Sequence, residues 1–139
     1  TAFSCLVGPG MFDRFILPDT VACCRHVDRI IYHLDGPGAL QHLDRLLAID
    51  ALHCVQWIQG AGAPLPSHWL DLLRRMQDGG KTVQLVYSGA HGGNADFKAE
   101  IDALCSALDP DRLFIMASVE SLEKAEFIVR HAREVARAR

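Results

Sequence analysis

Two side chains that can do chemistry, the imidazole of His33 and the carboxylate of Asp35, stand two residues apart at the end of an apolar run. The loop Gly36-Pro37-Gly38 follows them directly. Alternate residues of a β-strand project from one face, so we expect both groups to point the same way. Catalytic groups of α/β folds gather at such strand ends. The pair is therefore a candidate for proton transfer or metal binding, and a hydrogen-bonded pair that only stabilises the loop is the alternative.

The elements that position this pair repeat one unit four times, a short apolar run followed by a helix with apolar residues at i, i+3, i+4 and i+7. The predicted strands are Ile30–Leu34, His53–Ile58, Thr82–Tyr87 and Arg112–Ala117. A further helix, Gly10–Asp28, precedes the first strand and is interrupted or restarted at Pro18. The mainly apolar strands predict a parallel sheet covered on both faces. Residues 1–139 thus form a single α/β domain of parallel β/α units.

The number of units bears on the architecture. An eight-unit barrel needs about 250 residues, so four units in 139 residues predict half of a TIM-type (β/α)8 barrel, four strands with covering helices. A small open parallel sheet, complete as it stands, is the alternative. A half-barrel leaves two unpaired sheet edges and one exposed apolar face. We therefore expect either a homo-oligomer, such as a homodimer, or a fragment of a longer chain that lacks its N-terminal half.

Composition narrows the class of partner. The net charge of -3 and the pI near 6.1 provide no basic surface for nucleic acid. No apolar run approaches the roughly 20 residues that cross a bilayer, so no membrane partner is expected. Five cysteines without CxxC spacing predict buried, reduced thiols in a cytoplasmic protein. A small molecule is the expected substrate.

Several segments stand in an order that is typical of one enzyme superfamily. They are Gly8-Pro9-Gly10-Met11-Phe12-Asp13-Arg14-Phe15-Ile16-Leu17-Pro18, then Tyr32-His33-Leu34-Asp35-Gly36, Gln56-Trp57-Ile58-Gln59-Gly60-Ala61-Gly62 and Gly80-Lys81-Thr82-Val83-Gln84-Leu85. The first resembles the SPxMFxxFxxP helix of the uroporphyrinogen decarboxylase superfamily, which also contains the corrinoid methyltransferases. The second falls where those methyltransferases carry His-x-Cys-Gly. The resemblance covers almost the whole chain and implies the C-terminal half of a (β/α)8 barrel.

The resemblance also implies a zinc-dependent enzyme with a corrinoid as methyl donor, although the ligand set differs. The methyltransferases hold zinc with His-x-Cys and a second cysteine near the last strand. Here the corresponding metal ligands and catalytic pair are His33 and Asp35, and the last strand, Ile115-Met116-Ala117-Ser118, has no cysteine. Catalytic zinc takes three protein ligands. The candidates for a third ligand are His53, Cys54, His91 and a residue of the missing half.

The decarboxylase chemistry itself is less well matched. The Gly-His-Gly of the decarboxylase near the last strand is absent, and its arginine-rich motif and catalytic Asp belong to the N-terminal half. We therefore do not expect this chain alone to decarboxylate uroporphyrinogen.

Four further residues are candidates for substrate binding: Gln56, Trp57, Gln84 and Tyr87. Buried amides are costly without hydrogen bonds, so the two glutamines either line a polar lumen or bond to backbone. The two aromatic residues either wall the substrate or pack in the core. The glycine-rich run 88–94 is a weaker candidate, for an anion-binding loop. The alternative to an enzyme is a non-catalytic half-barrel remnant that self-associates.

Overall fold

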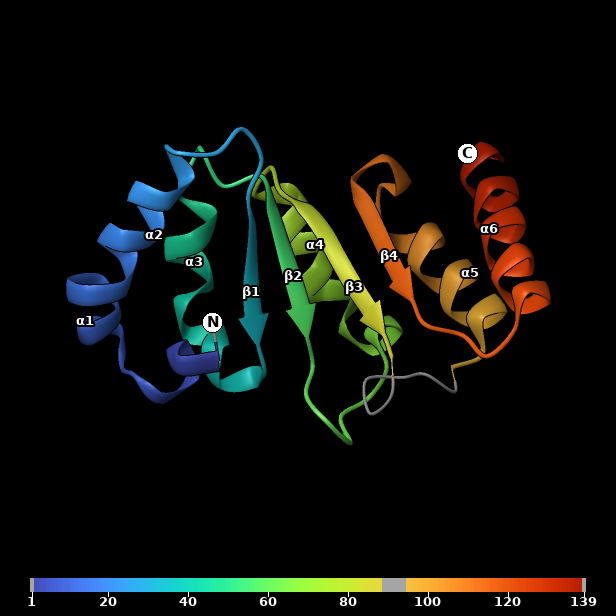
Figure 1. Cartoon of the computed structure of the whole chain (residues 1–139), viewed down its shortest axis with the longest axis horizontal. Helices are drawn as coiled ribbons and strands as arrows, with labels where there is room; N and C mark the ends of the chain where they lie inside the picture. Colours follow the sequence, from blue (N-terminus) through green and yellow to red (C-terminus); the bar gives the residue numbers. More distant parts are fainter. Residues whose placement is uncertain (1, 89–94, 139) are drawn as a thin grey trace.

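The computed structural model describes residues 2–88 and 95–138 and contains four parallel strands in the order β1-β2-β3-β4 (Figure 1). The strands are β1 (Ile31–Asp35), β2 (Cys54–Ile58), β3 (Thr82–Tyr87) and β4 (Leu113–Ala117). The helices are α1 (Pro9–Met11), α2 (Leu17–Cys24), α3 (Leu43–Leu47), α4 (Leu70–Asp78), α5 (Phe97–Ala107) and α6 (Leu122–Arg137). The predicted α/β class, a four-stranded parallel sheet with covering helices, is confirmed.

The helical stretch before β1 changes type instead of breaking at Pro18. A π-helical turn, Phe12–Ile16, joins α1 to α2, and Pro18 then occupies the first turn of α2. Proline has no N–H, and it is tolerated in a first turn because the N–H there has no partner within the helix. The N–H of Leu17 bonds to the carbonyl of Phe12, which is the longer step of a π-helix. The helical run is thus continuous through Pro18, where an interruption or restart was expected, and α2 ends at Cys24 and not near Asp28.

Short 3-10 helices lead into two of the covering helices. Pro37–His42 precedes α3, and Pro66–Trp69 precedes α4. Asp96 caps α5 by accepting from the N–H groups of Lys98 and Ala99, and Ser121 caps α6. Such caps satisfy amide donors that have no partner within the helix.

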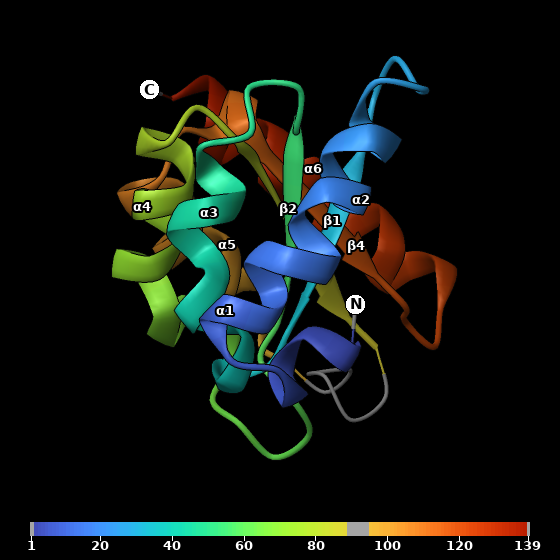
Figure 2. The ribbon, with the colours of Figure 1, turned by 90° about the vertical axis from the view of Figure 1, so that its left-hand side faces the viewer.

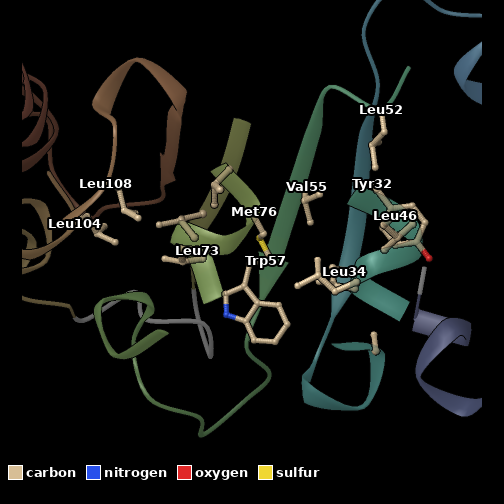
Figure 3. Packing of buried hydrophobic residues seen from close by; sticks show 14 of the residues in the cluster. Tyr32, Leu34, Leu46, Leu52, Val55, Trp57, Leu73, Met76, Leu104 and Leu108 are labelled. Carbon is tan, nitrogen blue, oxygen red and sulfur yellow. The ribbon is translucent and has the colours of Figure 1, made fainter. Parts of the chain in front are cut away.

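One face of the sheet packs against the helices and forms the core. Figure 2 shows α3, α4 and α5 on the same side of the strands. The strand residues that join the buried cluster on this side are Tyr32, Leu34, Val55, Trp57, Val83, Leu85 and Tyr87. Figure 3 shows Trp57 among Leu34, Leu73 and Met76. All four side chains are fully buried, so this layer supplies much of the apolar burial that stabilises the fold.

The other face of the sheet, called the open face below, carries the alternate strand residues. They are Ile31, His33, Asp35, Cys54, Gln56, Ile58, Thr82, Gln84, Val86, Phe114 and Met116. Figure 1 shows no α-helix in front of the strands on this side. Successive strands step in one direction across the sheet, and right-handed crossovers then place every connecting helix on the same side. The prediction of a sheet covered on both faces is therefore not met within the described residues.

Helix length bears on the membrane question. The longest described helix, α6, has 16 residues. Within residues 2–88 and 95–138, no helix combines the length and the apolar character that a membrane crossing requires.

Because the two faces of β1 differ in burial, shortening a side chain on each face should lower the free energy of unfolding by different amounts. Leu34 is fully buried on the helix side, whereas Ile31 exposes almost half of its surface on the open face. We expect Leu34→Ala to lower the free energy of unfolding by about 2–5 kcal/mol, because it leaves a cavity. The matched control Ile31→Ala should cost less than about 1 kcal/mol. Denaturant unfolding measures both values, and equal losses would contradict the assignment of the two faces.

Candidate functional site

His33 and Asp35 lie side by side on the open face. His33 Nε2 is 3.9 Å from Asp35 Oδ2, and the two side chains are 44% and 32% exposed. Asp35 is the last residue of β1, and Gly36 follows with a φ of 75°, a conformation that favours glycine. The N–H of Gly36 donates to the carbonyl of Ile58 at 2.8 Å, which fixes the turn against β2. The predicted projection of both groups to one side is confirmed.

A polar row crosses three strands next to this pair. The parallel register places His33 opposite Gln56, and Gln56 opposite Gln84. The imidazole Nδ1 of His33 donates to Gln56 Oε1, since a carbonyl oxygen only accepts. Gln56 Nε2 in turn donates to Gln84 Oε1 at 2.7 Å. The row therefore begins at the half-exposed histidine and ends at a glutamine that is 6% exposed.

This row shows how the two glutamine amides are hydrogen-bonded. Both amides bond to neighbouring side chains on the open face, instead of to backbone groups in the core. A buried amide without a partner is costly, and the row provides that partner for Gln56 and Gln84 at once. The glutamines thus support the histidine, and their direct contact with a substrate stays a prediction.

The expected third metal ligand is not found near His33 in the described part of the chain. Cys54 lies opposite Thr82, one row nearer the amino ends of the strands, and burial raises the pKa of its thiol to about 11. A protonated thiol is a poor ligand. His53 precedes β2 at the same end. His91 and the run 89–94 lie outside the described residues.

The described side chains supply few ligands for a metal ion at this site. Residues 2–88 and 95–138 contain no group of three or more His, Cys, Asp or Glu side chains placed to hold a metal ion. His33 and Asp35 supply two donors, whereas catalytic zinc takes three from protein. The described residues therefore do not by themselves fit a catalytic zinc ion.

Trp57 and Tyr87 are not brought to this site. Both are fully buried on the helix side of the sheet, Trp57 in edge contact with Trp69 and Tyr87 beside Phe97. Trp57 directly follows Gln56, and neighbouring residues of a strand face opposite ways. Their expected role as walls of a substrate pocket is therefore replaced by packing in the core.

Sequence reasoning missed the buried carboxylate of Glu100, which joins three segments near the carboxyl end of β3. Tyr87 donates its hydroxyl proton to Glu100 Oε2 at 2.7 Å, and Glu100 also accepts from the N–H of Ser67 at 3.2 Å. Burial, followed by the hydrogen bond to Glu100, raises the pKa of Tyr87 far above its usual value. Glu100 shares the inward face of α5 with Phe97 and Leu104, and that helical spacing was the available signal. The group ties β3 to α5 and to the segment before α4.

Comparisons of this chain with protein-family models, with curated proteins and with solved structures find no match. A role for the site therefore has to be argued from the geometry of its residues. What it offers is an oriented imidazole beside a carboxylate at the carboxyl end of a parallel sheet.

Proposed function

We propose that this chain is part of a uroporphyrinogen decarboxylase-like enzyme that acts on a small molecule over the carboxyl ends of β1, β2 and β3. One observation supports this most strongly: His33 is held through Nδ1 by Gln56 and stands 3.9 Å from Asp35 at the strand end. An imidazole fixed in this way takes or gives a proton at Nε2. The adjacent carboxylate stabilises the imidazolium that forms.

The finer proposal is an enzyme of the zinc-dependent corrinoid methyltransferase type. The resemblance of residues 8–18 to the family helix supports it, as does the position of His33 at the end of β1. Because His33 and Asp35 are only two donors, this proposal requires a further donor from outside the described residues. The corrinoid donor rests on the resemblance alone.

The surface of the chain supports completion of the sheet by another body. Ten large apolar side chains are exposed in the described residues: Phe3, Leu6, Met11, Phe15, Val27, Ile31, Phe114, Met116, Leu122 and Val129. All of them belong to β1, to β4 or to the segments that lie beyond these two edge strands. The central elements β2, β3, α3, α4 and α5 contribute none to this set. Exposed apolar surface gathered at unpaired edges is typical of an interface.

The number of helices indicates what kind of body fits. Figure 1 shows α2 beyond β1 and α6 beyond β4. With the continuous run from α1 to α2 counted as one, five α-helical segments in the described residues cover or flank the four strands. In a closed (β/α)8 ring, each gap between strands holds one helix. Two copies would bring ten such segments to eight gaps, and α6 of one copy would compete with α2 of the other for the same gap. A body with four strands and three helices avoids this conflict, which favours a complementary half over a second copy.

Zinc binding provides a test of the metal assignment. We expect zinc added to the purified chain to bind weakly through the imidazole and carboxylate, and His33→Ala to weaken that binding by more than about tenfold. Asp35→Asn should have a similar effect. The matched control is His26→Ala, which removes an exposed histidine whose Nδ1 contacts the Ala22 carbonyl. Calorimetric titration gives the affinities, and zinc binding that survives His33→Ala would contradict the assignment.

The second candidate function is a non-catalytic half-barrel that self-associates, which the apolar edges favour. This alternative predicts a discrete particle of twice the 15.3 kDa chain mass, dissociated by Met116→Glu on the open face of β4. The control Ala99→Glu changes an exposed residue of α5 and should leave the mass unchanged. Light scattering after gel filtration measures it. The enzyme proposal predicts no such closed two-copy particle, because the helices conflict, and finding one would favour the alternative.

A further inference from the structure

The polar row on the open face has a direction, from the donor on His33 to the acceptor on Gln84 at its buried end. Gln84 Oε1 accepts from Gln56 Nε2 at 2.7 Å, so the amide of Gln56 turns its oxygen toward β1. That oxygen accepts from His33 Nδ1. If the Gln56 amide were reversed, its NH2 group would face His33, and Nδ1 would have to be the acceptor. The orientation of one amide therefore decides which ring nitrogen of His33 carries the proton.

We propose that Gln84 is a positioning residue that acts through Gln56 to hold neutral His33 in the Nδ1–H tautomer. Free histidine in water favours the other tautomer, with the proton on Nε2. The hydrogen bond made by one ring nitrogen sets the protonation of the other. Gln84 is well placed for this task, because it is buried beside Gln56 and lies two strands away from the solvent-exposed ring.

The tautomer also defines the chemical class of ligand at this site. With the proton on Nδ1, Nε2 carries a lone pair, and it lies 3.9 Å from Asp35 Oδ2, which also only accepts when ionised. Two acceptors at this spacing bind a group that brings hydrogen-bond donors, such as an ammonium or a hydroxyl. They disfavour a carboxylate or a phosphate. This inference deepens the proposed function and relies on it only for what the site is used for.

The tautomer can be measured directly on the folded chain. Long-range proton–nitrogen NMR spectra of histidine rings distinguish the two neutral forms, and the spectrum of His33→Ala assigns the His33 signals. At a pH where the ring is neutral, we expect Nδ1–H to be the major form. A major Nε2–H form would overturn the proposal without any variant being made.

The role of Gln84 is tested by Gln84→Leu, which keeps the size of the side chain and removes the acceptor. We expect the ratio of Nδ1–H to Nε2–H to fall by about fivefold, the effect of losing one ordinary hydrogen bond. The control Gln59→Leu replaces another buried amide, whose Oε1 has no hydrogen-bond partner in the described residues, and should leave the ratio unchanged. An unchanged ratio in Gln84→Leu would overturn the role of Gln84.

A second variant and the choice of readout distinguish failure of this proposal from misfolding of Gln84→Leu and from failure of the proposed function. If Gln84→Leu does not fold, Gln56→Leu breaks the same row at its middle and should lower the ratio similarly. If the ratio does not change in folded Gln56→Leu, the proposal is likewise overturned. The measurement needs no ligand, metal or activity, so its result does not depend on the zinc titration that tests the proposed function.

Discussion

The in-register parallel pairing of β1, β2 and β3 is the constraint on which the site depends. It places residues 33, 56 and 84 in one row, where their side chains form a continuous set of hydrogen bonds. Alternation along a strand makes this register strict, because a slip of one residue exchanges the two faces. In β2, such a slip would turn Gln56 into the apolar core and bring Trp57 onto the open face. The burial of Trp57 and the hydrogen bonds of Gln56 therefore stabilise the same register.

The same arrangement explains why one face is polar in its middle and apolar at its margins. The row occupies β1 to β3, whereas Phe114 stands opposite Gln84 on β4 and has no polar group to extend the row. Apolar residues then continue beyond both edge strands, over the first helical segments and α6. A body that completes the sheet would bury these margins and enclose the row. In the proposed complete sheet, the apolar edges and the polar site would belong to one enclosure.

Much of this could be predicted from the sequence, because it depends on short-range periodicity. No strand boundary differs from its predicted position by more than one residue, and the shared face of His33 and Asp35 follows from alternation. The same rule shows that Gln56 and Trp57 cannot both line one surface. Other features depend on tertiary contacts. Sequence alone does not reveal that Gln84 bonds to Gln56, nor that Glu100 is buried against Tyr87, because both depend on how separate elements meet.

The polar row can be tested by the through-space NMR contacts of the Gln56 side-chain amide. The protons of this amide lie between β1 and β3 if the row exists. We expect cross-peaks to the His33 ring and to the Gln84 side chain, and none to Leu73 or Met76 of α4. Cross-peaks to those two core residues, without any to His33, would place Gln56 on the helix side and contradict the site.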